Sequence, residues 1–174
     1  MGEIILKEDD ITDIDKLNDY NNDYLSYYSD YVPFVSPENY NDILERNKLL
    51  REGIGNGGVK EIYYWAIKDN KIIGHASIRL NPEVDEGILK YCGHIMYGVI
   101  PSMRKKGYGS RICGLLIDKM KELGYETVYI TCSEDNVSSA KVIENHGGKY
   151  IETVEPDMKN TTKRTKRYCV NIRQ

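Results

Sequence analysis

Three cationic side chains and two glycines stand together in the segment Arg104-Lys105-Lys106-Gly107-Tyr108-Gly109, shortly after a proline and before an amphipathic stretch. The first turn of a helix presents unpaired N–H groups and a partial positive charge, and glycine lets an anion approach the backbone. We therefore predict that this segment binds phosphate groups at the start of a helix. It lacks the third glycine of a dinucleotide-binding loop and the Gly-Lys-Ser/Thr triplet of a P-loop. Taken alone, it is equally consistent with a tight turn that carries a solvated basic face.

The hydrophobic and turn residues around this loop predict the elements that position it. Before residue 60 we expect a strand over residues 4–6, a helix from residue 11 to about 25, an irregular segment within residues 20–40 and a helix over residues 37–51 with Ser36 as N-cap. Runs 61–67 and 72–80 are joined by Asp69-Asn70 and predict an antiparallel hairpin. A strand over residues 91–100 leads into the loop, helices are expected over residues 112–123 and 136–146, and strands over 127–132, 149–154 and around Cys169. This order predicts a mixed α/β fold with a central twisted sheet.

Composition limits the classes of partner. The 174 residues, with a net charge of −3, suit one compact domain. Acidic residues predominate before residue 60, and every charged residue after Asp157 is basic, so a continuous basic stripe for nucleic acid is missing. No apolar run approaches the roughly 18 residues that cross a bilayer, and we expect a cytoplasmic protein that does not enter the membrane. The four cysteines have neither Cys-x-x-Cys spacing nor a histidine at ligand spacing, so neither a metal site nor a disulfide framework is predicted.

Two separated motifs resemble the GNAT superfamily of N-acetyltransferases. That family's signature is Arg/Gln-x-x-Gly-x-Gly/Ala after a strand that ends near a proline, and Val99-Ile100-Pro101 followed by Arg104 to Gly109 matches it position by position. Downstream, Asn136-Val137-Ser138-Ser139-Ala140 leads into Ile143-Glu144-Asn145-His146-Gly147-Gly148, a second match in the expected order. The resemblance covers residues 60–155 well and the first 60 residues weakly.

The resemblance implies a GNAT-like mixed, mostly antiparallel sheet of about seven strands, flanked by about four helices and with two splayed central strands. It implies acetyl-coenzyme A (acetyl-CoA) as the acetyl donor, with its arm inserted between the splayed strands and no metal. Val99 and Ile100 would then hydrogen-bond the pantetheine or the thioester carbonyl through their main chain. Asn136 and Ser139 would form the pantetheine wall. The pyrophosphate would lie on the backbone amides of Arg104, Lys105, Lys106, Gly107, Tyr108, Gly109 and Ser110.

Acetyl transfer to nitrogen requires a group that accepts a proton from the amine. Our leading candidate is His94, which precedes the cofactor-contacting residues on the same predicted strand; the alternative is that it packs or satisfies a polar group. His75, on the neighbouring predicted strand, is a weaker candidate, and His146 suits the end of a helix. The family's tyrosine that protonates the departing thiolate corresponds to Ile143, so the general acid is open. An acetyl-cysteine at Cys132 is disfavoured because no base stands beside it in the sequence.

The first 60 residues would hold the acceptor side, residues 61–155 the acetyl-CoA core, and residues 156–174 a terminal strand of the same domain. Tyr27, Tyr28, Tyr31 and Phe34 are predicted to line an apolar slot, with Asp23, Asp30 and Glu38 attracting a cationic amine. Ordinary packing and surface acidity explain the same residues equally well. We expect direct attack of a primary amine of a small molecule or peptide in a ternary complex, by a protein able to form a homodimer through its basic terminal strand. The alternative is an inert module that binds or senses acyl-CoA.

Overall fold

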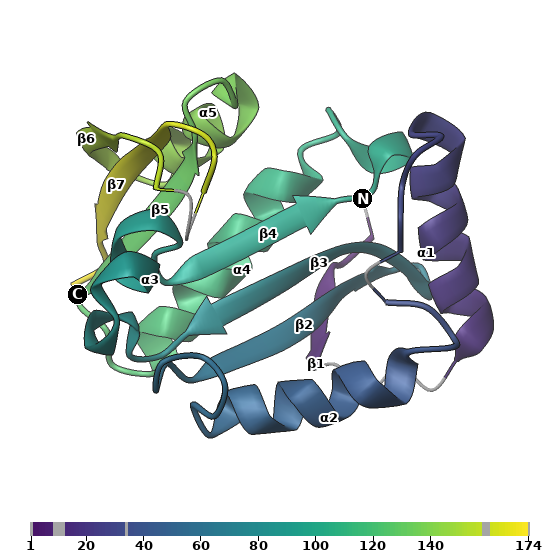
Figure 1. Ribbon diagram of the computed structural model, residues 1–174. Coiled ribbons are helices and arrows are strands. Elements are labelled where there is room, and N and C mark those ends of the chain that lie inside the picture. The colour runs from purple at the N-terminus through teal and green to yellow at the C-terminus, as the bar shows by residue number, and fades with distance from the viewer. Residues whose placement is uncertain (1, 9–12, 34, 158–160, 174) are drawn as a thin grey trace.

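The computed structural model describes residues 2–8, 13–33, 35–157 and 161–173 as one α/β unit (Figure 1). Its strands are β1 (Ile5–Glu8), β2 (Glu61–Lys68), β3 (Lys71–Arg79), β4 (Ile95–Val99), β5 (Thr127–Ser133), β6 (Lys149–Val154) and β7 (Thr165–Asn171). Its helices are α1 (Ile14–Tyr27), α2 (Tyr40–Arg51), α3 (Glu86–Tyr91), α4 (Tyr108–Glu122) and α5 (Val137–Asn145), with short 3-10 turns η1 (Pro82–Val84) and η2 (Pro101–Met103). The predicted mixed α/β class is confirmed.

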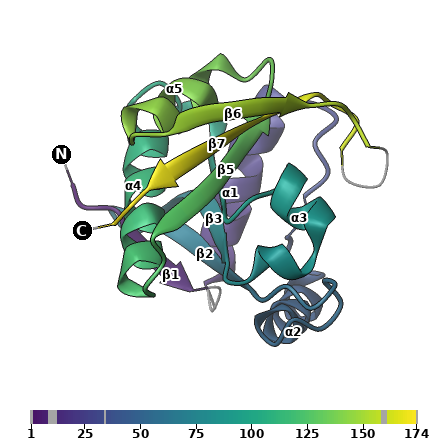
Figure 2. The same cartoon turned by 90° about the vertical axis from the view of Figure 1, so that its left-hand side faces the viewer.

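The strands form one seven-stranded sheet in the order β1-β2-β3-β4-β5-β7-β6, with every neighbouring pair antiparallel except β4 and β5. Helices α1 and α2 cover one face, whereas α4 lies on the opposite face (Figures 1 and 2). The predicted hairpin is present, and Asp69 and Asn70 at its turn have φ values of 48° and 62°. Asp and Asn tolerate this left-handed conformation better than other residues with side chains, which is why this pair specifies the turn.

Strands β4 and β5 diverge in the middle of the sheet, as the resemblance implied (Figure 1). Over these two fully described strands, parallel pairing is limited to Ile95 opposite Ile130. Gly93, with φ 64°, makes a further bridge to Ile130 just before β4 begins. The sheet is therefore closed at the start of β4 and open along the rest of that strand, toward the loop that carries the glycines.

The prediction of one long strand over residues 91–100 is wrong in its first half. Residues 86–91 form α3, because the Asp85 side chain caps its start by accepting a hydrogen bond from the Ile88 N–H at 3.0 Å. The chain then turns at Gly93, where an added Cβ would lie 2.5 Å from the Tyr129 carbonyl oxygen. Helix α3 also raises the number of α-helices above the expected four.

The first two helices differ from their predicted bounds. Helix α1 continues to Tyr27, so the irregular segment is shorter than expected. Helix α2 begins at Tyr40 instead of Pro37, and the Asn39 side chain accepts a hydrogen bond from the Ser36 N–H at 2.7 Å. The Asn39 side chain thus reaches back to Ser36 before the helix starts, and the N-cap is Asn39 and not Ser36.

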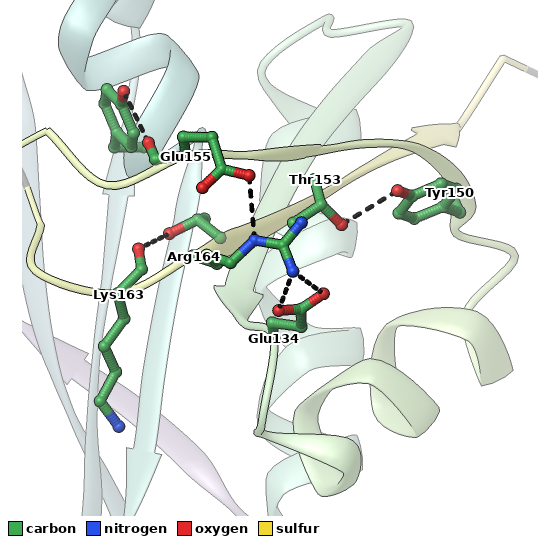
Figure 3. A network of polar contacts seen from close by, with 8 residues as sticks. Glu134, Tyr150, Thr153, Glu155, Lys163 and Arg164 are labelled. Atoms are coloured by element: carbon green, nitrogen blue, oxygen red, sulfur yellow. Dashed lines mark hydrogen bonds and ion pairs between the residues drawn. The ribbon is translucent and has the colours of Figure 1, made fainter.

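The basic C-terminal strand is inserted into the sheet, because β7 pairs with both β5 and β6. The basic residues immediately before it are compensated by carboxylates of neighbouring elements. Arg164 donates two hydrogen bonds to Glu134, at 3.0 and 2.8 Å, and one to Glu155 at 3.0 Å (Figure 3). Lys163 pairs with Asp135 in the same region. The outer strand on this side is thus β6, so the terminal strand is not free to extend the sheet, and a homodimer stays a prediction.

Two hydrophobic clusters hold the layers together. The larger lies between the sheet and α4 and α5, and includes Ile112, Leu116 and Ile143. The smaller lies between the sheet and α1 and α2, and includes Leu17, Tyr20 and Trp65. Among the helices of the described residues, none is both long and apolar enough to cross a bilayer.

Candidate functional site

The predicted phosphate loop does end at the start of a helix. Gly107 is the N-cap of α4, with φ 79° and no side chain that could accept a hydrogen bond, and the first intrahelical bond runs from the Arg111 N–H to the Gly107 oxygen. The amides of Tyr108, Gly109 and Ser110 therefore have no capping side chain. Lys105, with φ 59°, is also left-handed. Segments in which right-handed and left-handed residues alternate make successive backbone N–H groups converge on an anion. The geometry fits a diphosphate.

The side chains of the loop divide into two groups. Lys105 and Lys106 are exposed and supply positive potential. Arg104 turns away from the helix start: its Nε donates to the Val99 carbonyl oxygen at 3.1 Å, and its Nη1 donates to the Tyr28 hydroxyl at 2.6 Å. Its guanidinium also lies about 6 Å from the ring centres of Tyr24 and Tyr28. The structure thus uses the Arg104 side chain to tie the loop to α1.

Strand β4 presents a free main-chain edge to the gap beside β5. The Ile100 N–H donates to the Ile73 oxygen at 3.0 Å, and the Ile100 oxygen accepts from the Met103 N–H at 3.0 Å. Because main-chain groups alternate in direction along a strand, those of Tyr97 and Val99 point into the gap instead of toward β3. Ile100 is therefore already hydrogen-bonded within the fold. Of the two predicted residues only Val99 faces the opening, and because its carbonyl oxygen accepts from Arg104 Nε, the group that it can offer there is its N–H.

The second motif lies on the other side of this gap. The Asn136 side chain caps α5 by accepting from the Ser139 N–H at 3.0 Å. The Ser139 hydroxyl lies 3.1 Å from the Tyr97 hydroxyl, so this hydrogen bond joins α5 to β4. Burial raises the pKa of Tyr97, which keeps its hydroxyl protonated. We had not predicted Tyr97; its place two residues before Val99 on the same strand face was the available signal.

Two of the open questions about the acid and the nucleophile receive a structural answer. Ile143 is fully buried in the larger hydrophobic cluster, so its position is a core position in this chain. Cys132 is also buried, and desolvation raises the pKa of its thiol. A protonated thiol is a weak nucleophile, which opposes an acetyl-cysteine route.

His94 lies at the closed end of the gap. It immediately precedes β4, is 5% exposed, and its Nδ1 accepts a hydrogen bond from the Tyr129 N–H at 3.1 Å. Its ring stacks on Tyr129 and meets the edge of Tyr125. Val99 is five residues away along an extended strand, roughly 16 Å at 3.3 Å per residue. This placement favours packing for His94 over proton transfer, and its assignment as base stays a prediction.

A cavity of about 330 Å³ lies between the sheet and helices α1 and α2. It is lined by Tyr20, Tyr24, Tyr31, Val35, Tyr40, Ile43, Leu44, Asn47, Tyr63, Tyr64, Trp65, His75 and Met96. Tyr24 and Tyr31 stack with ring centres 4.8 Å apart, and Trp65 meets the edge of Tyr20 at 5.2 Å. The cavity therefore has an aromatic wall, and Met96 of β4 forms part of it.

Of the residues predicted for the acceptor slot, Tyr31 lines this cavity. Tyr27 and Tyr28 are exposed and do not line it, and Phe34 lies outside the described residues. The described lining includes no carboxylate or other charged side chain. Asp23 instead accepts a hydrogen bond from the Ser102 N–H at 3.0 Å, while the exposed Asp30 and Glu38 lie apart from the lining. The acidic attraction that we had predicted has no counterpart inside the cavity.

His75 is the titratable imidazole of this cavity. Its Nδ1 lies 2.8 Å from the Tyr20 hydroxyl, a contact between residues 55 apart in the sequence. Burial, and secondly the charge of Arg104, lower its pKa to about 4, so the ring is neutral near pH 7. Desolvation likewise lowers the pKa of His94 to about 4. Position within the fold, and not protonation state, distinguishes the two histidines.

No cluster of three or more His, Cys, Asp or Glu able to hold a metal occurs among the residues that the structure describes.

Comparison with known proteins gives independent evidence on the family and the fold of the chain. The profile of the acetyltransferase (GNAT) family matches residues 17–147. The search of curated protein sequences gives no match. Among solved structures, an acetyltransferase from Salmonella typhimurium that modifies the N-terminal serine of ribosomal protein L7/L12 superposes with a TM-score of 0.70 at 16% identity, covering 98% of this chain and 95% of that one.

Two further solved structures are similar in the same way. The microcin C7 self-immunity acetyltransferase MccE, in complex with acetyl-CoA and AMP, has a TM-score of 0.72 and 15% identity over 98% of this chain and 93% of that one. A spermidine N-acetyltransferase chimera from Vibrio cholerae and hSSAT has a TM-score of 0.63 and 16% identity over 97% and 95% of the two chains. At these identities the likeness concerns the fold.

Proposed function

Because this chain belongs to the GNAT acetyltransferase family, we propose that it moves the acetyl group of acetyl-CoA to a primary amine by direct attack in a ternary complex. One observation carries the proposal. Beyond Ile95, strand β4 does not pair with β5, and along that strand the start of α4, which no side chain caps, lies on one face and the aromatic cavity on the other. A strand in this position can contact the acetyl donor from one face and the amine acceptor from the other.

The donor would be held mainly by the backbone. We propose that the amides of Lys105 to Ser110 bind the pyrophosphate and that the main chain of Val99 binds the pantetheine or the thioester oxygen. An N–H aimed at that oxygen stabilises the negative charge that develops there during attack. Tyr97 and Ser139, which meet across the gap, would form the pantetheine wall with the capped start of α5. Acetyl-CoA supplies an activated acyl group.

The acceptor would place an apolar body in the aromatic cavity. An ammonium group that enters loses its hydration and meets no carboxylate among the described lining residues. Burial of this kind favours the neutral amine, which is the nucleophilic form. The similar structures act on a protein N-terminus and on spermidine according to their descriptions, so they leave several amine classes open. We favour a primary amine attached to an apolar or aromatic group.

The test is release of free CoA thiol from acetyl-CoA across a library of amines, together with calorimetric titration of CoA. The library should include arylalkylamines, polyamines, aminoglycosides and short peptides with free N-termini. We expect turnover with amines that carry an apolar body, and little with strongly anionic acceptors. Tight CoA binding without turnover of any amine would overturn the proposal in favour of an inert acyl-CoA-binding module, an outcome that the buried Ile143 at the usual acid position makes worth testing.

A further inference from the structure

Beyond the choice of donor and acceptor, we infer that His75 is the general base of the acetyl transfer and that Tyr20 positions it. This inference rests on the proposed function. It departs from the sequence-based preference for His94, and it depends on contacts that join α1, β3 and β4.

The first observation is the orientation of the imidazole. With Nδ1 at 2.8 Å from the Tyr20 hydroxyl, a neutral ring that donates its Nδ1–H to the phenol oxygen keeps a lone pair on Nε2. The Tyr20 hydroxyl also interacts with the Tyr24 side chain, which offers a second partner for its own proton. Tyr20 is buried by Leu17 and Trp65 in the smaller cluster, so its position is fixed by packing. In the tautomer that donates from Nδ1 to Tyr20, Nε2 is the atom available for accepting a proton.

The second observation is the contact of the ring with Gly98. A Cβ added at Gly98 would lie 2.5 Å from the Cε1 atom of His75 and 2.7 Å from its Nε2. The Cε1 and Nε2 atoms of the ring thus lie against Gly98, the strand residue between Tyr97 and Val99, whose main-chain groups point into the gap. Glycine is the residue type that leaves room for the imidazole at this place. The other two histidines make different contacts: His94 bonds the Tyr129 N–H, and His146 lies 3.1 Å from the Ser110 hydroxyl.

The third observation is the charge around the ring. Tyr20 contacts the ring, and Tyr24, Tyr63, Trp65, Asn47 and Met96 line the same cavity, with Arg104 more distant. None of these supplies a negative charge that would keep the imidazole protonated. Its pKa, lowered to about 4 by burial, leaves the ring neutral near pH 7.

The step balances as follows. The neutral amine attacks the thioester carbonyl carbon, a C–N bond forms, and the nitrogen becomes cationic and acidic. His75 Nε2 accepts one proton from that nitrogen and later releases it to solvent. The C–S bond breaks, and the thiolate takes up a proton from solvent, so the products are an acetamide and CoA thiol. Relative to the neutral amine no net proton is produced or consumed.

The experiment measures kcat, CoA affinity and pH dependence with 2-phenylethylamine as the acceptor, or with the best amine of the library. We expect His75→Gln to lower kcat about 10²- to 10⁴-fold, the range for loss of a general base, with CoA affinity within about twofold. For His75→Ala, added imidazoles should restore part of the rate, and the restored rate should rise with the pKa of the imidazole. A purely structural role would not produce that correlation.

Tyr20→Phe tests the positioning role. Loss of one hydrogen bond to the imidazolium should lower kcat by about three- to tenfold and shift the acid limb of its pH profile to lower pH. Tyr150→Phe is the matched control, since it removes a hydroxyl that bonds Thr153 at 3.0 Å on β6. His94→Gln tests the competing assignment.

The outcomes separate the two claims. Wild-type turnover combined with full activity of His75→Gln overturns the inference and leaves the proposed function intact. A larger loss in His94→Gln than in His75→Gln also overturns it, in favour of His94. Absence of wild-type turnover with every amine refutes the proposed function itself. Loss in His75→Gln with imidazole rescue of His75→Ala supports both.

Discussion

A single methyl group added at Gly98 should disable the base without touching the donor site. In Gly98→Ala the new Cβ would meet the imidazole of His75 at 2.5 Å, whereas ordinary contact begins near 3.4 Å. The ring must therefore retreat by about 0.9 Å or the strand must move. The Tyr20 hydroxyl and the neighbouring Trp65 restrict that retreat. A misplacement of about 1 Å in a catalytic group can cost about 100-fold in rate, and overpacking costs about 1–3 kcal/mol of stability.

The assay compares the wild type, Gly98→Ala, Gly124→Ala, His75→Gln and the double variant Gly98→Ala/His75→Gln for thiol release, CoA binding and urea unfolding. We expect Gly98→Ala to lose about 100-fold in kcat while its CoA dissociation constant stays within about threefold of the wild type. Gly124→Ala is the control for stability: its φ of 86° makes any side chain strained, no atom lies within 4 Å of the added Cβ, and it follows α4 at the end remote from the loop. It should lose stability to a similar extent and retain kcat.

The double variant Gly98→Ala/His75→Gln decides the cause. If the methyl group acts through His75, the double variant should be no slower than His75→Gln alone, because the same interaction cannot be lost twice. Additive losses would show that Gly98→Ala acts elsewhere, for example on the main chain of β4. Wild-type kcat in a folded Gly98→Ala protein would refute the reasoning entirely.

Three further predictions concern the donor loop, pH and the core. Gly107→Ala places a side chain at φ 79°, where the left-handed conformation costs about 1–2 kcal/mol, and should weaken CoA about tenfold by calorimetry, whereas Gly124→Ala at the other end of α4 should not. Because the pKa of His75 and of His94 is lowered from 6.5 to about 4, the unfolded chain binds more protons between these pH values. The free energy of unfolding should therefore fall as pH falls from 6.5 to 4, by up to about 1.4 kcal/mol per pH unit for each histidine. In urea unfolding measured at several pH values, the free energy of unfolding of each His→Gln variant should depend less steeply on pH. Glu61 accepts from Arg79 at 2.8 Å and from Ser77 at 2.6 Å in a buried cluster, so Glu61→Gln should cost about 3–5 kcal/mol in urea unfolding, and a loss below 1 kcal/mol would contradict it.

Local sequence determined the features whose causes lie within a few residues. The loop before α4 needed only cationic residues, a glycine that adopts φ 79° and an apolar helical face after it, all within one short segment. The Asp69-Asn70 turn, the hairpin and the class of the fold follow from the same kind of evidence. Where a competing local signal was overlooked, as at Asp85, which caps α3, the predicted strand was too long. Loop and helix start are local because backbone conformation and capping act over about one turn.

Tertiary structure alone decided which residues meet at the site. His75 and His94 both belong to the strand region, but only packing shows that one faces an aromatic cavity beside Gly98 and the other is buried against Tyr129. The cavity draws on α1, α2, β2, β3 and β4, and its contact between Tyr20 and His75 spans 55 residues. The same holds for Arg104, whose partner Tyr28 lies 76 residues away. Such contacts depend on how whole layers pack, which no local pattern of side chains encodes, so the donor loop was readable in the sequence and the acceptor side was not.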